Sequence, residues 1–278
     1  MANIHDDPRE DQLMSDRLFT KIIAELSQCG YSNRISFYSN NEPTLDSRLA
    51  DFVARARTAI PRAYLEIKSN GKGLNSDKVV SFFNAGIDTF YINDYTQDGE
   101  HSNNIKKIKI ELEGSRRFGG HFDGTENLFY KRLIIFKRQV DQILGARAGT
   151  APNKAPPIKP LQQLCFRPYE MMTISPNGVV GVCTDDLLFA SKMGDINQQT
   201  ITEIWQSERY KEYRKHLIVG ERGALTPCSQ CDYGGYSLES LAEAGIVTRK
   251  LMTRQRFRSF LVGLTVIKNR PKYKPSDP

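Results

Sequence analysis

Apolar positions in the first half of the chain switch between helical and strand-like spacing. Met14, Leu18, Ile22 and Leu26 recur every fourth residue, as they do along one face of a helix. Short β-prone runs follow, each separated from the next by turn residues and another helical pattern. The predicted order is helix 11–28, strand 34–39, turn 40–43, helix 45–56, strand 63–68, helix 76–85, strand 87–93, helix 104–112 and strands 133–136 and 140–144. Strands that alternate with helices predict an α/β fold with a parallel sheet.

The second half follows a different pattern, beginning after the proline-rich segment 149–160, which we interpret as a linker. Ser175-Pro-Asn-Gly178 lies between two short apolar runs and predicts a tight hairpin. Thr200 and Glu203 form a capping-box pattern that begins a helix, which we expect to end near Gly220. We therefore divide the chain into residues 1–154, 155–236 and 237–278.

The last segment carries the net positive charge of the chain. The sequence has a formal net charge of +7, and residues 247–278 hold nine Lys or Arg against one Asp, so the remainder sums to −1. A basic surface that would bind nucleic acid is therefore not predicted. Phe257, Phe260, Leu261 and Leu264 are spaced along one helical face, which predicts a basic amphipathic C-terminal helix.

Hydropathy excludes a long membrane span. The chain has no run of eighteen apolar residues, and its polar first twelve residues lack the apolar core of a signal peptide. We expect a cytoplasmic protein. Five cysteines in a cytoplasmic chain of 278 residues favour metal ligation over a disulfide framework, because cytosolic thiols are kept reduced.

Four cysteines fall close together in the second half. Seventeen residues separate Cys165 from Cys183, forty-four separate Cys183 from Cys228, and two separate Cys228 from Cys231. Two-residue spacing lets both sulfurs of a loop bind one centre, and four thiolates suit either tetrahedral zinc or a [4Fe–4S] cluster. Spacing does not separate these two metals. Cys29 stands alone at the end of an amphipathic helix, where a packed thiol is the simpler interpretation.

Residues around the four cysteines resemble the SPASM/twitch accessory domain of radical S-adenosylmethionine (SAM) enzymes. The motifs in order are Cys165-Phe-Arg-Pro-Tyr169, Ser175-Pro-Asn-Gly178, Cys183, Gly194-Asp-Ile196, Glu203-Ile-Trp205 and Cys228-Ser-Gln-Cys-Asp232. The resemblance implies iron–sulfur rather than zinc, with Cys165, Cys183, Cys228 and Cys231 holding one auxiliary [4Fe–4S] cluster. Four cysteines are similar to the twitch form of the domain, as in butirosin-type aminocyclitol dehydrogenases.

The first half resembles the partial (β/α)6 barrel of the same enzymes. Asn40-Asn41-Glu42-Pro43 is similar to the GGEP motif, which holds the amino group of SAM, although Asn replaces both glycines. Ser69-Asn70-Gly71 is similar to the motif that ends the third barrel strand. Arg147 occupies the place of an Arg that faces the active-site cavity in relatives. The resemblance thus implies that Asn41, Glu42, Ser69, Asn70 and Arg147 contact the cofactor. Without it, all five are ordinary turn or surface residues.

The sequence departs from the family at one essential motif. Its five cysteines form no CxxxCxxC loop, the element that holds the SAM-cleaving [4Fe–4S] cluster, and the first barrel strand is also missing. We expect an N-terminal truncation, with in-frame codons for both elements upstream of Met1. The intact form would bind SAM and a second [4Fe–4S] cluster. Two alternatives are a catalytically degenerate iron–sulfur partner protein and a zinc-stabilised interaction protein.

The resemblance also implies a reaction and its partners. The intact enzyme would abstract hydrogen through a 5′-deoxyadenosyl radical, and the auxiliary cluster would accept the second electron of a two-electron oxidation. Candidate substrates are sugars, aminocyclitols and peptides, and the reducing partner would be a flavodoxin or ferredoxin. The chain as given is expected to be inactive.

Overall fold

The computed structural model describes residues 12–39, 41–113, 127–128, 131–140, 145–151 and 154–235. These residues form two compact units, which divide between Gln142 and Ile143. The predicted boundary at residues 154 and 155 lies further along the chain. The predicted basic amphipathic C-terminal helix, in segment 237–278, lies outside the described residues. No described helix has the length and apolarity needed to cross a membrane.

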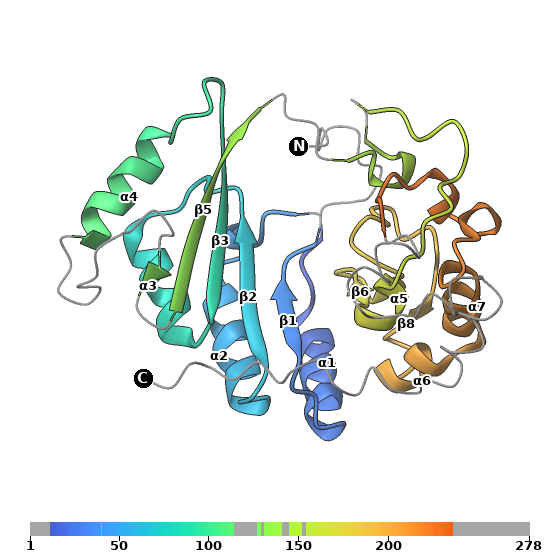
Figure 1. The fold of residues 1–278 in the computed structure, drawn as a ribbon. Helices are drawn as coiled ribbons and strands as arrows, with labels where there is room; N and C mark the ends of the chain where they lie inside the picture. The colour runs from blue at the N-terminus through green and yellow to red at the C-terminus, as the bar shows by residue number, and fades with distance from the viewer. Residues whose placement is uncertain are drawn as a thin grey trace, which may run out of the picture. The chain divides into compact units, whose positions relative to one another are not determined.

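The first unit is a five-stranded sheet in the order β1-β2-β3-β5-β4 (Figure 1). Strands β1 (Arg34–Phe37), β2 (Tyr64–Ser69), β3 (Thr89–Thr96) and β5 (Lys131–Gln139) are parallel to their neighbours, and β4 (Asn127–Leu128) is antiparallel to β5. The helices of this unit are α1 (Asp16–Gln28), α2 (Leu49–Ala59), α3 (Ser76–Ala85) and α4 (Asn103–Glu113), with a 3-10 turn η2 (Pro43–Leu45). This alternation confirms the α/β class with a parallel sheet.

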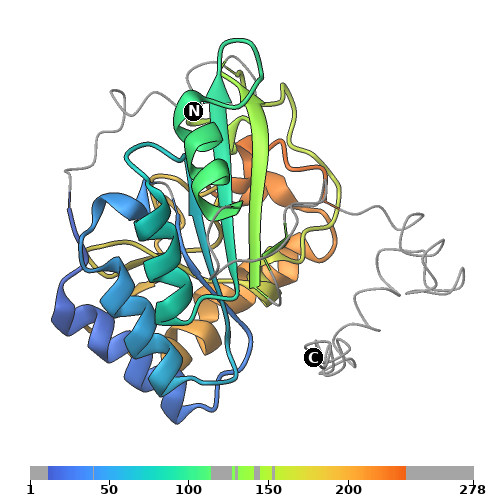
Figure 2. The ribbon, with the colours of Figure 1, turned by 90° about the vertical axis from the view of Figure 1, so that its left-hand side faces the viewer.

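One face of the sheet packs against all four helices, which stand together on its near side in Figure 2. Alternate strand residues supply this face, and parallel register brings Ile67 beside Phe90 and Ile92 beside Ile135. Burying such side chains contributes about 1.5–3 kcal/mol each. The core members are Phe19, Ile23, Leu49, Phe52, Val53, Ala56, Ile60, Ala63, Leu65, Ile67, Leu74, Val79, Phe82, Phe83, Ile87, Phe90, Ile92, Ile105, Ile108, Leu112, Leu133 and Ile135. The first unit therefore has a hydrophobic core of its own.

The opposite face of the sheet is polar and aromatic. Buried Glu66 accepts a hydrogen bond from Ser36 Oγ at 2.9 Å, and Lys68 Nζ lies 3.3 Å from the same carboxylate. The Lys68 ammonium also lies 5.4 Å from the centre of the Tyr91 ring, and that ring stacks on Phe136. Strand alternation places these side chains opposite to the helices.

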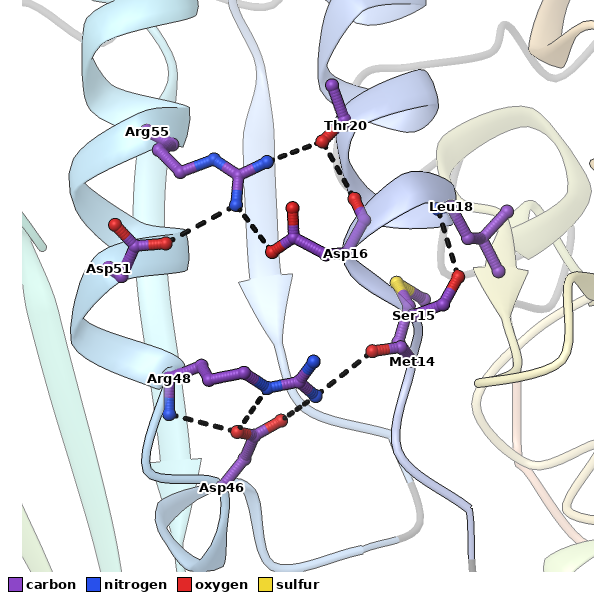
Figure 3. Close-up of polar contacts among 9 residues, drawn as sticks. All are labelled: Met14, Ser15, Asp16, Leu18, Thr20, Asp46, Arg48, Asp51 and Arg55. Carbon is purple, nitrogen blue, oxygen red and sulfur yellow. Dashed lines mark hydrogen bonds and ion pairs between the residues drawn. The ribbon is translucent and has the colours of Figure 1, made fainter.

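Two arginines join helix α1 to helix α2 (Figure 3). Arg48 donates to the Asp46 carboxylate at 2.7 Å and to the Met14 carbonyl at 3.0 Å. Arg55, which lies within α2, donates to the Asp16 carboxylate at 2.8 Å. Half-exposed ion pairs each contribute little to the free energy of folding. These contacts therefore orient α1 against α2 and add little to stability.

The elements of the first unit follow the sequence prediction closely, with differences at their ends. Helix α3 has its predicted bounds, and Asn75 caps it by accepting from the Lys78 N–H. Helix α1 begins later than predicted, because Ser15 accepts from the Leu18 N–H and serves as its N-cap. Val140 lies in a turn after β5, and the rest of the predicted strand 140–144 lies outside the described residues.

The second unit is built of short elements. It contains a three-stranded sheet of β6 (Thr173–Ile174), β7 (Val179–Gly181) and β8 (Gly194–Asp195), all antiparallel. Its helices are α5 (Arg167–Glu170), α6 (Ile201–Gln206) and α7 (Glu208–Leu217), and its 3-10 turns are η4 (Arg147–Gly149), η5 (Arg222–Ala224) and η6 (Cys228–Gln230). The predicted hairpin is confirmed as β6 and β7.

The prediction of one helix from Thr200 to near Gly220 is wrong in one respect, because this stretch forms two helices, α6 and α7. The Thr200 and Glu203 capping box is present and begins α6. Ser207 then adopts an extended conformation and accepts from the Tyr210 N–H, so it ends α6 and caps α7. The apolar pattern continues through this break, and the pattern alone therefore could not reveal it.

Candidate metal centre

Four cysteines surround one hollow in the second unit. The hollow encloses about 310 Å³, part of it open to solvent, and its wall includes Cys165, Cys183, Cys228 and Cys231. Sixty-two residues separate Cys165 from Cys228, so only the fold brings them together. Among the described residues, no three Cys, His, Asp or Glu side chains are already arranged to hold a metal ion. The structure thus gathers the predicted ligands, and their role as ligands stays a prediction.

Separate elements position each of the four sulfurs. The Cys165 N–H donates to the Leu217 carbonyl at 2.9 Å, which ties the segment before α5 to the end of α7. Cys183 lies two residues after β7, and Cys228 begins turn η6. The Cys231 N–H donates to the Cys228 carbonyl at 3.2 Å and closes that turn. A closed 3-10 turn turns both sulfurs of the Cys-x-x-Cys pair toward the same side.

Burial holds all four thiols in their neutral form. Burial raises the pKa of Cys183 to about 12, although the charge of Arg167 acts in the opposite direction. The pKa of Cys228 is also well above its usual range, because burial and the three neighbouring cysteines disfavour a thiolate. Burial raises the pKa of Cys165 and Cys231 as well. A bound metal cation would favour the thiolate forms, and metal binding would then release their protons.

Two arginines line the same hollow. Arg167 Nη1 lies 3.9 Å from the Cys183 sulfur and forms an ion pair with Asp185. Arg222 is 1% exposed and donates to the carbonyls of Gln163 at 2.9 Å and Tyr233 at 2.6 Å. Its Nη2 is buried without a partner among the described residues. Positive charge beside four thiols suits an anionic metal centre, and the residues present therefore fit a four-thiolate group.

Glu42 and Asn70, predicted to contact SAM, lie together at the carboxyl ends of neighbouring strands in the first unit. The Asn70 N–H donates to Glu42 Oε2 at 2.6 Å. Glu42 Oε1 accepts from both the backbone N–H and the hydroxyl of Thr44, at 3.1 and 2.6 Å. A carboxylate offers about four acceptor positions, so this network uses three of them. Ser69 is buried and accepts from the Gly71 N–H, whereas Asn41 is exposed.

Arg147 belongs to the second unit, in turn η4. Arg147 and Ala148 both have positive φ angles, of 45° and 51°, which non-glycine residues rarely adopt. The turn is held at its base by the Ala146 N–H, which donates to Asp232 Oδ2 at 2.9 Å, and by Lys154 Nζ, 2.6 Å from the same oxygen. Asp232 directly follows Cys231, so the Arg147 turn is attached to the cysteine loop.

Sequence reasoning missed the functional potential of Arg222, and it quoted Arg167 only as part of a motif. An Arg in a loop is normally exposed to solvent. No sequence spacing distinguishes an Arg that is buried in the fold from an exposed one. Their burial beside the thiols becomes visible only in the folded unit.

Comparisons with known proteins relate the region that contains the four cysteines to an iron–sulfur domain. Residues 165–269 match the SPASM family, described as an iron–sulfur cluster-binding domain. Over 224 residues the chain is 26% identical to the S-adenosyl-L-methionine-dependent 2-deoxy-scyllo-inosamine dehydrogenase of Niallia circulans, covering 81% of this chain and 82% of the relative.

Two solved structures share the fold. BtrN in complex with AdoMet and 2-DOIA superposes with a TM-score of 0.67 at 24% identity, covering 81% of this chain and 82% of that one. Selenomethionine BtrN in an open conformation gives a TM-score of 0.57 at 22% identity, covering 79% and 80%. The SPASM match and the likeness to a SAM-dependent dehydrogenase make the chain similar to radical SAM enzymes, although its 278 residues contain no CxxxCxxC motif.

Proposed function

We propose that this chain is the auxiliary-cluster and SAM-contacting part of a radical SAM oxidoreductase that acts on an aminocyclitol or a related sugar. One observation carries the proposal: the four cysteines of the SPASM-matched region line a single hollow. Cys165, Cys183, Cys228 and Cys231 would hold one [4Fe–4S] cluster. When bound, this cluster supplies a one-electron acceptor, as the oxidation of an alcohol to a ketone requires.

Two residues of this chain, Glu42 and Arg147, would position SAM or the substrate and supply charge beside it. Glu42 fixes the loop after β1 to the end of β2 through Asn70, and its remaining acceptor position is available to the amino group of SAM. Arg147 lies on a strained turn attached to the cysteine loop and would contact substrate or cofactor. Strain of this kind is typical of sites where position matters more than stability.

The SAM-cleaving cluster has no ligand set in this sequence. Its CxxxCxxC loop is not among the 278 residues, so the proposal for this chain covers the auxiliary centre and the SAM contacts only. The aminocyclitol class is taken from the dehydrogenase relative, which acts on 2-deoxy-scyllo-inosamine.

Anaerobic reconstitution tests the metal assignment. We expect about four irons and four sulfides per chain, with a brown colour that bleaches on reduction with dithionite, as for one cubane cluster. A colourless protein with one zinc per chain would contradict the proposal and favour a zinc-stabilised interaction protein. Isothermal titration with 2-deoxy-scyllo-inosamine then tests the substrate class, with an unrelated peptide of similar size as the control ligand.

A further inference from the structure

The strongest unexplained feature outside the assigned ligands is the buried charge of Arg222. Its guanidinium is almost wholly removed from solvent, and its hydrogen-bond partners in the described residues are two neutral carbonyls and no carboxylate. A buried cation without an anion is costly, and proteins normally pair it. The second unit should therefore supply an anionic partner.

The hollow provides the place for that anion. Arg222 lines the hollow together with Cys165, Cys183, Cys228 and Cys231, so this residue and the proposed ligands share one wall. Four thiolates around a [4Fe–4S]²⁺ core leave a net charge of about −2, and one-electron reduction makes it about −3. Arg167 also faces the hollow, but Asp185 already neutralises part of its charge.

We propose that Arg222 is the internal counter-ion of the metal centre, which stabilises the metal-loaded domain and raises the reduction potential of its cluster. The inference rests on the proposed four-cysteine centre and deepens it, because it assigns a positioning and tuning role to a residue that binds no metal itself. The reduced cluster carries more negative charge than the oxidised one. A nearby fixed cation therefore stabilises the reduced form more and favours electron acceptance.

Arg214 provides a matched control within the same unit. It is half-buried, less completely than Arg222, and its Nη2 likewise lacks a partner among the described residues. However, its guanidinium lies 4.3 Å from the Trp205 ring centre and 4.8 Å from that of Tyr210, and Arg214 is not part of the wall of the hollow. Loss of Arg214 should therefore affect packing without affecting the metal centre.

The experiment compares Arg222→Gln, Arg222→Lys and Arg214→Gln in the full chain. Co²⁺ is titrated into each metal-free protein, and binding is followed by the thiolate charge-transfer absorbance. We expect Arg222→Gln to bind Co²⁺ about 10- to 100-fold more weakly than the wild type. Arg222→Lys keeps the charge and should lose less, and Arg214→Gln should bind like the wild type. Equal weakening in Arg222→Gln and Arg214→Gln would overturn the proposal.

Redox titration of the iron-reconstituted proteins gives the second measurement. Arg222→Gln should have a lower reduction potential, by about 59 mV for each tenfold loss of preference for the reduced state. Arg222→Lys should stay close to the wild type, and an equal fall in the Lys and Gln variants would overturn the role of charge. If Arg222→Gln does not fold, the Lys variant carries this test alone.

The two measurements keep the proposals distinguishable. If the wild type takes up Co²⁺ but not iron, the iron–sulfur function fails while the Co²⁺ comparison still decides the role of Arg222. If the wild type binds iron and the potential is unchanged in Arg222→Gln, the counter-ion role fails while the cluster assignment stands.

Discussion

At the scale of single residues, the four thiols of the second unit differ from the fifth cysteine of the chain. Cys165 and Cys228 are buried in the wall of the hollow, whereas Cys29 is exposed and its sulfur donates to the Leu26 carbonyl at 3.3 Å. A thiol that binds metal and one that does not should therefore respond differently to substitution.

Replacing Cys228 or Cys231 by Ala should release the metal, because each removes one of four thiolates from the centre. Iron content after reconstitution should fall well below that of the wild type. Cys29→Ala is the matched control and should retain full iron content. Full iron content in both Cys228→Ala and Cys231→Ala would refute the ligand assignment.

The buried thiols also predict how the stability of the metal-free protein depends on pH. Burial raises the pKa of Cys183 from 9.0 to about 12, so the folded protein keeps a proton that the unfolded chain loses above pH 9. The stability from this group is complete below pH 9 and is lost as pH rises toward 12. Urea unfolding at pH 8 and pH 10 should show a lower midpoint at pH 10.

Cys183→Ser is the control for this titration, since a serine hydroxyl does not ionise in the same range. Its unfolding midpoint should fall less between the two pH values than that of the wild type. An identical fall in both proteins would mean that Cys183 does not contribute.

The limits of sequence prediction are clearest at residue scale. Spacing and composition were enough to select the four cysteines that the fold gathers, because thiols are rare and their positions in loops are informative. The same reasoning could not select Arg222. Its guanidinium donates to the carbonyls of Gln163, 59 residues away, and Tyr233, 11 residues away, and neither residue is of a type that signals a buried Arg.

At the scale of elements, apolar periodicity predicts a helix better than it predicts the ends of that helix. Helix α3 has its predicted bounds, since Asn75 and Gly86 are standard capping residues at its two ends. Strand β8 was missed because its two residues, Gly194 and Asp195, are too few to show alternation. Short elements are fixed by their partners in the fold rather than by their own sequence.

Gly220 follows the end of α7, at a position with no room for a side chain. Its φ is +77°, and a Cβ atom there would lie 1.9 Å from the Gln162 carbonyl oxygen. Gly220→Ala should therefore destabilise the second unit by about 2–4 kcal/mol, through overpacking and backbone strain. Thermal unfolding of the metal-free protein measures this loss.

Gly223 is the control for this substitution. A Cβ atom at Gly223 would make only ordinary contact with Pro160, at 3.5 Å. Gly223→Ala should change stability by about 0.5 kcal/mol or less. A similar cost for both substitutions would show that the close approach at Gly220 is not responsible.

At the scale of the whole molecule, the two units depend on different sources of stability. The first has a continuous core between its sheet and four helices. The second consists of two- and three-residue strands, short helices and a hollow lined by thiols. Metal binding is coupled to folding where the ligands come together only in the folded chain, so a bound metal would contribute to the stability of the second unit.

Removing the metal should therefore loosen one unit and leave the other intact. Hydrogen exchange of the reconstituted protein, measured before and after chelation, should show lost protection within residues 154–235. Protection within residues 49–113 should stay unchanged, and these residues serve as the internal control. Loss of protection in both ranges together would contradict this separation.

The attachment of the Arg147 turn to Asp232 has a consequence for signalling between the metal and the substrate side. Asp232 is covalently adjacent to Cys231, and it accepts from Ala146 on one side of Arg147 and pairs with Lys154 on the other. Gly149 also lies against the Gln230 side chain, because a Cβ atom added at Gly149 would lie 3.1 Å from Gln230 Cβ. A shift of the Cys-x-x-Cys loop would therefore be transmitted to the turn that carries Arg147. The presence of a metal in the four-cysteine site would in this way control the position of Arg147.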